Sequence, residues 1–103
     1  MDVSLLVLNA GLLSKGQHGK VTPKEVQALM DVNMYHPTAM LKKFLPKLSK
    51  REKQSGIIFV SSLTGLICIP AGSSYSASKA YINYLALAVD YELTATGRTN
   101  IDT

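Results

Sequence analysis

Two short apolar runs constrain the fold of this chain more than any other feature. One runs from Val3 to Leu8 and is followed by the turn residues Asn9-Ala10-Gly11, and the other runs from Gly56 to Ser61. A short apolar run bounded by turn residues is typical of a strand in a parallel sheet. Helical patterning separates the two runs, so we expect parallel strands joined by right-handed crossovers. The sequence therefore predicts an α/β fold.

Local signals mark the helices between these strands. Thr22-Pro23-Lys24-Glu25 begins the first helix, with threonine at the N-cap, proline at the first helical position and glutamate at the third. Pro37 is expected to break or kink this helix, because proline lacks an N–H group and restricts the preceding residue. A second helix is then expected from Thr38 to about Lys50.

The last third of the chain predicts another helix and strand. The helix is expected to begin with a Ser73 or Ser74 cap and to end near Thr96, where Gly97 suits the position after the last turn. The residues from Asn100 onward are expected to begin a third strand. Successive right-handed crossovers place all the helices on one face of the sheet, although the strands are apolar on both faces. The sequence therefore predicts a sheet face that this chain does not cover.

Composition excludes several classes of protein. The apolar fraction of 47% is too high for a disordered chain, and 103 residues fit one domain over residues 1–103. The apolar runs are far shorter than the ~18 residues that span a membrane. Cys68 is the single cysteine, which excludes an internal disulfide and favours a reducing, cytoplasmic compartment; a membrane-associated parent protein stays open. Its apolar surroundings predict a buried, inert thiol.

The charge pattern gives little support to a nucleic-acid or metal partner. The net charge is +4, and much of the positive charge lies between Lys42 and Lys53. A solvated helix end explains this cluster, because cations are favoured near helix C-termini. A basic RNA-binding fragment is the weaker interpretation. His18 and His36 have no evident metal partners, so we expect surface or packing roles for them and no metal site.

Ser62, Tyr75 and Lys79 form the constellation with the most chemical meaning. Tyr75 precedes Lys79 by four residues, so both side chains lie on one helical face, where an ammonium group favours the phenolate form of tyrosine. Ser62 and Asn9 follow the two predicted strands, whose carboxyl ends form the ligand-binding edge of an open α/β sheet. Tyr-x-x-x-Lys alone is a weak signal that also describes ordinary helix surfaces. With Ser62, it predicts proton transfer at a carbonyl or alcohol.

These elements together resemble the short-chain dehydrogenase/reductase family. Asn9-Ala10-Gly11 is similar to the family's Asn-Ala-Gly element, Val32-Asn33 to its helix-kinking asparagine, and Ser61-Ser62 to its strand-ending serine. Tyr75-Ser76-Ala77-Ser78-Lys79 is similar to its active-site motif. The resemblance covers essentially the whole chain. It implies a partial Rossmann-like, doubly wound parallel sheet that carries the central catalytic segment, with a hydroxysteroid-dehydrogenase-like member as one candidate.

The resemblance implies an NAD(P)-dependent oxidoreductase that interconverts a carbonyl and an alcohol by hydride transfer. Tyr75 would exchange the proton with the substrate, and Ser62 would hydrogen-bond the substrate oxygen. Lys79 would bind the nicotinamide ribose and activate the tyrosine. Asn33 would hold a relay water through its backbone.

The cofactor implied by the resemblance is NAD or NADP, with NADP favoured. The residues expected to lie against it are Asn9, Ala10, Gly11, Tyr75 and Lys79. Simpler roles stay open for several site residues. Asn33 can serve only as a helix-kink residue, Asn9 can stabilise the turn after its strand, and Ser62 can act as a cap.

Departures from the family pattern are as informative as the matches. This chain has no Gly-x-Gly, so the pyrophosphate-binding fingerprint is not in it, and neither are the family's first three strands or its substrate lid. Leu8 stands where the family often has asparagine. The chain is expected to be the central third of a reductase, and by itself to show little or no turnover.

The expected partners follow from the resemblance and from one apolar loop. Residues 66–70 are apolar and suggest a lipophilic carbonyl or alcohol substrate, such as a steroid or a long acyl chain. The family implies a homodimer or larger assembly through the helix over residues 74–96, whose tyrosines Tyr81, Tyr84 and Tyr91 are expected to pack. The alternative function is a non-catalytic remnant that acts as a structural or dimerisation subunit.

Overall fold

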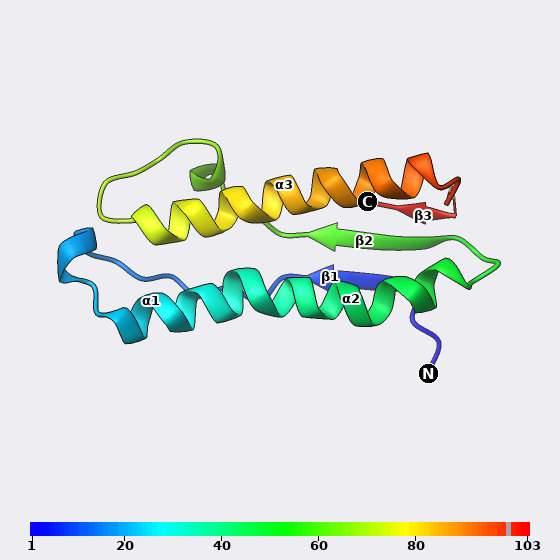
Figure 1. Cartoon of the computed structure of the whole chain (residues 1–103), viewed down its shortest axis with the longest axis horizontal. Coiled ribbons are helices and arrows are strands. Elements are labelled where there is room, and N and C mark those ends of the chain that lie inside the picture. Colours follow the sequence, from blue (N-terminus) through cyan, green and yellow to red (C-terminus); the bar gives the residue numbers. More distant parts are fainter. Residues whose placement is uncertain (99) are drawn as a thin grey trace.

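The computed structural model describes residues 1–98 and 100–103, and it confirms an α/β arrangement with a parallel sheet. Three strands lie in the order β1-β2-β3, and the helices run beside them along the length of the sheet (Figure 1). The strands are β1 (Leu5–Leu8), β2 (Ser55–Phe59) and β3 (Ile101–Asp102). The helices are η1 (His18–Lys20), α1 (Pro23–Met30), η2 (Asp31–Tyr35), α2 (His36–Ser49), η3 (Leu63–Gly65) and α3 (Ser73–Ala95).

The register of the sheet aligns the carboxyl ends of its two main strands. Leu5 of β1 pairs with Gly56 of β2, and Leu8 pairs with Phe59, so both strands end at the same edge. The observed strands are each slightly shorter than the predicted runs, although the Gly56 N–H still donates to the Ser4 carbonyl and the Val60 N–H to the Leu8 carbonyl. This alignment places the residues after β1 and the residues after β2 side by side.

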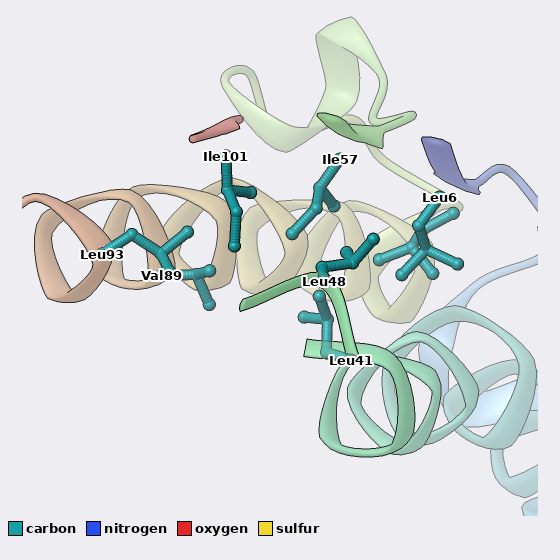
Figure 2. Packing of buried hydrophobic residues seen from close by; sticks show 8 residues of the cluster. Leu6, Leu41, Leu48, Ile57, Val89, Leu93 and Ile101 are labelled. Carbon is teal, nitrogen blue, oxygen red and sulfur yellow. The ribbon is translucent and has the colours of Figure 1, made fainter. Parts of the chain in front are cut away.

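The sheet is covered on one face. Leu6, Ile57 and Ile101 point toward the helices and pack against Leu48 and Val89, which belong to α2 and α3 (Figure 2). Their neighbours on the opposite face, Leu5, Val7 and Ile58, are 53%, 49% and 48% exposed. The alternation confirms the prediction that the helices of this chain lie on one face, and it leaves apolar side chains bare on the other.

The first helix begins as its sequence predicts. The backbone N–H of Glu25 donates to the Thr22 hydroxyl at 3.2 Å, and the Thr22 N–H donates to the Glu25 carboxylate at 2.8 Å. This capping box satisfies two backbone donors at the start of α1. The bond from the Thr22 backbone, followed by one from its hydroxyl, lowers the pKa of Glu25 from its ordinary value of 4.5.

The sequence predicts a break or a kink at Pro37; the break is wrong, because the helix continues and widens, and the kink stays a prediction. The chain stays helical from α1 through η2 into α2, which begins at His36 and not at Thr38. η2 is a π-helix, and the His36 N–H donates to the carbonyl of Asp31, five residues earlier. A local change of hydrogen-bond register accommodates a residue that has no N–H to donate. The widened segment carries Asn33, which is buried.

The two ends of α3 differ in how well sequence predicts them. The serine cap is wrong: Gly72 occupies the N-cap without a side-chain bond, and the Ser73 hydroxyl lies 3.1 Å from Nδ1 of His18 instead. The C-terminal end is confirmed. Gly97 has a φ of +73°, and the N–H groups of Gly97 and Arg98 bond the carbonyls of Thr94 and Leu93. This is the Schellman geometry that glycine permits.

The exposure of Cys68 and of two α3 tyrosines differs from what the sequence predicts. Cys68 is exposed, not buried, because the loop between η3 and α3 projects beyond the sheet edge (Figure 1). Tyr84 and Tyr91 are also exposed, at 75% and 68%, so they do not pack within the described part of the chain. Tyr81, in contrast, is half-buried, and its hydroxyl lies 2.6 Å from that of Thr38. The core-facing side of α3 instead carries Ile82 and Val89. None of the described helices is long and apolar enough to cross a membrane.

Candidate active site

A small cavity lies at the edge where β1 and β2 end. Its volume is about 60 Å³, and it is open to solvent on one side. The residues that line it include Asn9, Ala10, Asn33, Val60 and Lys79. These residues come from the turn after β1, from η2, from the end of β2 and from α3. The cavity therefore lies where open α/β sheets bind their ligands.

Lys79 supplies the charge of this site. Its side chain is only 5% exposed, yet among the described residues the carbonyl of Val60, 3.3 Å from Nζ, is its one recorded hydrogen-bond partner. An ammonium group has three donors, so the others are available to a ligand. Nζ also lies 5.7 Å from the ring centroid of Tyr75, one helical turn earlier on α3. The structure thus brings together the two residues of the predicted Tyr-x-x-x-Lys pair, with Tyr75 half-buried.

The turn after β1 comes within contact distance of Lys79. A methyl group placed on the Cα of Gly11 would lie 3.4 Å from Nζ of Lys79 and 3.9 Å from Oδ1 of Asn33. A methyl group here would therefore be in ordinary van der Waals contact with both side chains. The Asn9-Ala10-Gly11 turn thus lies beside Lys79, and all three residues are exposed to solvent. Their contact with a cofactor stays a prediction.

Asn33 ties η2 to the same turn. Its Oδ1 accepts from the Leu12 N–H at 2.7 Å, and its Nδ2 donates to the Leu12 carbonyl at 2.9 Å and to the Ser78 hydroxyl at 3.1 Å. Both amide protons are therefore used inside the protein. The side chain acts as a structural clamp, and the predicted backbone role of Asn33 stays a prediction.

Ser62 is the N-cap of η3 and lies three residues after the end of β2. Its Oγ accepts hydrogen bonds from the backbone and from the hydroxyl of Thr64, at 3.3 and 3.1 Å, so Ser62 caps this short helix. These bonds use the acceptor capacity of the hydroxyl and leave its proton free to donate to a ligand oxygen. Among the described residues, no hydrogen bond joins Ser62 to Tyr75.

Several residues that shape the site were missed in the sequence. The Ser61 hydroxyl donates to the Lys79 carbonyl at 3.2 Å, and Ser78 lies between Asn33 and Tyr75. A side chain on Gly65 would lie 3.0 Å from the backbone carbon of Lys79, so glycine lets η3 approach α3 closely. No local signal identifies such residues, because their partners lie 14 or more positions away or depend on helix packing. Within the described residues, no cluster of three or more metal-ligating side chains exists.

Comparison with known proteins places this geometry in a family. The model of the short chain dehydrogenases matches residues 1–102. The mouse protein Dehydrogenase/reductase SDR family member 7B is 38% identical over 77 residues, which are 75% of this chain and 24% of the mouse protein. The chain belongs to the short-chain dehydrogenase/reductase family. It spans about a quarter of the length of curated relatives such as this one.

Solved structures share the fold. A short chain dehydrogenase/reductase from Burkholderia phymatum in complex with NAD has a TM-score of 0.93 at 23% identity, over 98% of this chain and 36% of that chain. The angucycline C-6 ketoreductase LanV with bound NADP has a TM-score of 0.80 at 29% identity, over 91% of this chain and 35% of that chain. The partial sheet described above is therefore part of a Rossmann-like fold.

Proposed function

We propose that this chain carries the proton-transfer residues of a nicotinamide-dependent carbonyl/alcohol oxidoreductase. One observation supports the proposal above all others. Lys79 is a buried cation with unused donors, and it lies beside both the Tyr75 ring and the Asn9-Ala10-Gly11 turn. A buried charge without a full set of partners is costly unless a ligand completes its environment.

The residues around the cavity fit the ribose end of a nicotinamide cofactor. The free donors of Lys79 suit ribose hydroxyl oxygens, and the spacing at Gly11 lets the backbone of the turn lie close to a ligand. When bound, NAD or NADP would exchange a hydride with the substrate carbon. LanV, the more similar of the two solved structures by sequence, holds NADP, which favours NADP here.

The chain's own residues then handle the proton and the substrate oxygen. In the reducing direction, the Tyr75 phenol donates its proton to the carbonyl oxygen, and in the oxidising direction the phenolate accepts the alcohol proton. The free proton of Ser62 hydrogen-bonds the same oxygen. Lys79 stabilises the phenolate by its charge, and the Asn33 backbone holds a water that relays protons toward Lys79.

The substrate is proposed to be lipophilic. Leu63, Leu66 and Ile67 are 79%, 78% and 67% exposed, and they lie between Ser62 and Tyr75 in the chain. Exposed apolar side chains next to a polar catalytic group suit a substrate with one carbonyl or hydroxyl on an apolar body. A steroid or a long acyl chain has this form.

The test compares two tyrosine variants. They are made in whichever form of the protein oxidises alcohols or reduces carbonyls with NAD(H) or NADP(H). Tyr75→Phe removes the phenol proton and should lower kcat about 10²- to 10⁴-fold. Tyr35→Phe, at an exposed tyrosine of η2, should leave kcat unchanged. Equal turnover in both variants would contradict the proposal, as would the lack of nicotinamide-dependent turnover in every form that contains this chain.

The 103-residue chain alone is proposed to have little or no turnover. Residues that could hold a pyrophosphate in a Gly-x-Gly turn are not part of its sequence. Titration of the purified chain with NADPH, followed by fluorescence, should show no saturable binding in the micromolar range. Robust turnover with saturable binding would overturn this proposal.

A second candidate function is a structural or dimerisation subunit. The bare apolar face of the sheet and the exposed Tyr84 and Tyr91 of α3 favour it, because exposed apolar patches mark interaction surfaces. A homodimer through the helix over residues 74–96 is compatible with both functions. If Tyr75→Phe changes no cellular activity while substitution of Tyr84 or Leu85 abolishes assembly, the structural function is favoured.

A further inference from the structure

Ser78 occupies a buried position that the proposed chemistry does not use directly. It is completely buried on α3, next to Lys79. Its hydroxyl donates to the carbonyl of Tyr75 at 2.7 Å and accepts from Nδ2 of Asn33 at 3.1 Å. These two bonds join the first turn of α3 to the π-helical segment η2, which lies 45 positions earlier in the chain.

The hydrogen bonds of Ser78 continue through Asn33 to the turn after β1, at the edge of the sheet where the cavity lies. Asn33 is bonded to both the N–H and the carbonyl of Leu12, the residue after Gly11. The order is therefore Tyr75 carbonyl, Ser78 hydroxyl, Asn33 amide and Leu12 backbone. It connects the residue that bears the phenol with the turn that approaches Lys79. A hydrogen bond joins each of these groups to the next, and the Tyr75 ring takes part in none of them.

We propose that Ser78 is a positioning residue, whose hydroxyl holds the first turn of α3 against Asn33 and so sets the Tyr75 phenol relative to the Gly11 turn. The inference rests on the proposed function of Tyr75. Loss of the hydroxyl leaves an Nδ2 donor of Asn33 buried without its partner, which favours local movement of the clamp. Small displacements of a reacting group reduce rates strongly, because proton transfer needs a narrow range of distances.

The chain supplies a matched control in Ser76. It lies two residues earlier on the same helix and is 4% exposed, so serine to alanine makes the same chemical change in a similarly buried place. Among the described residues, its hydroxyl has no hydrogen-bond partner. Any difference between Ser78→Ala and Ser76→Ala therefore reports the two bonds of Ser78 and not the loss of an oxygen atom.

The first measurement is hydrogen exchange of the Leu12 amide in the full chain. This N–H donates to the Asn33 side chain, so its exchange reports whether the hydrogen bond between Leu12 and Asn33 is intact. Ser78→Ala should accelerate this exchange about tenfold, the effect of losing roughly 1.4 kcal/mol of a buried hydrogen bond. Ser76→Ala should leave it unchanged. Equal exchange in the two variants would overturn the inference, whether or not the chain is catalytic.

The second measurement is steady-state kinetics of the form that shows turnover, corrected for the folded fraction. Ser78→Ala should lower kcat about tenfold and leave the KM for the cofactor within about twofold, because the Gly11 turn and Lys79 are retained. Ser78→Thr keeps the hydroxyl and should restore most of kcat. A parallel loss in Ser76→Ala would overturn the inference, since burial alone would then explain it.

The two proposals fail in different ways. If Tyr75→Phe retains full kcat, the proposed function fails, and the exchange of the Leu12 amide still decides whether Ser78 holds the clamp. If Tyr75→Phe loses activity while Ser78→Ala matches Ser76→Ala in both measurements, the positioning role of Ser78 fails and the function of Tyr75 stands.

Discussion

Two glycines of this chain differ in how closely other residues surround them. Gly11 lies near both Lys79 and Asn33, whereas Gly19, in the short helix η1, has open space where a side chain would extend. The first glycine is therefore expected to matter for ligand binding and the second is not. Both residues have ordinary backbone angles, so the difference between them comes from their surroundings and not from strain.

Replacing Gly11 with alanine should weaken cofactor binding. A methyl group would be in ordinary van der Waals contact with Nζ of Lys79, at 3.4 Å, and would occupy space beside the ammonium group that the proposed ligand needs. We expect KM for the cofactor to rise about tenfold, equivalent to about 1.4 kcal/mol, in the form of the protein that shows turnover. Gly19→Ala is the control and should change KM by less than twofold. A similar KM in both variants would contradict the assignment of this turn to the cofactor.

Individual elements show which parts of the fold sequence can predict. The capping box of Thr22 and Glu25 and the glycine after α3 were predicted correctly, because each depends on residues within one helical turn. The continuation of the helix through Pro37 was not, because a π-helical turn shifts the hydrogen-bond register over several residues before the proline, and local preferences do not indicate it. Tertiary packing overrides local preference in such cases.

The residues of the candidate site also divide into those that the sequence identifies and those that it does not. Tyr75 and Lys79 were found from their spacing on one helix, and Asn9-Ala10-Gly11 was found from its place at a strand end. The bond between Asn33 and Ser78 crosses 45 positions and left no pattern in the sequence. The exposure of Cys68 was predicted wrongly for a related reason, since apolar neighbours in sequence do not show whether a loop is covered.

The capping box makes the stability of α1 depend on pH. Its bonds lower the pKa of Glu25 below 4.5, so they stabilise the folded chain above the unfolded pKa and are lost as pH falls through the folded pKa. Thr22→Ala removes the pH-independent bond from the Glu25 N–H and should lower the free energy of unfolding at pH 7 by about 1 kcal/mol. The loss should be somewhat smaller at pH 3, because the bond from the Thr22 hydroxyl to the Glu25 carboxylate also disappears and depends on pH. Urea unfolding of the chain at the two pH values measures this. Lys24→Ala, at an exposed neighbouring position, should have little effect; a pH-independent loss in Thr22→Ala would contradict the account.

At the scale of the whole molecule, the sheet has one covered face and one bare face. Ile57 and Ile58 are neighbours on β2, yet the first is 2% exposed against the helices and the second is 48% exposed on the opposite face. Parallel sheets in globular proteins are generally covered on both faces. The bare face is therefore expected to bind apolar probes or partners.

A pair of threonine variants separates these two faces. Ile57→Thr places a hydroxyl in the core and should lower the free energy of unfolding by about 2 kcal/mol or more. Ile58→Thr should change stability by less than about 0.5 kcal/mol, while it lowers the binding of a fluorescent apolar dye to the folded chain. Urea unfolding and dye titration measure the two effects. Equal destabilisation by the two variants would show that both faces are covered.

The central claim is that Lys79 assists proton transfer at Tyr75, and one comparison of lysine variants tests it most directly. The measurement is kcat with NAD(H) or NADP(H) for Lys79→Met and for Lys43→Met, which removes an exposed lysine of α2. Methionine keeps much of the side-chain volume and removes the charge. The account predicts that kcat falls at least about 100-fold in Lys79→Met and stays unchanged in Lys43→Met. Full turnover in a folded Lys79→Met protein would contradict it.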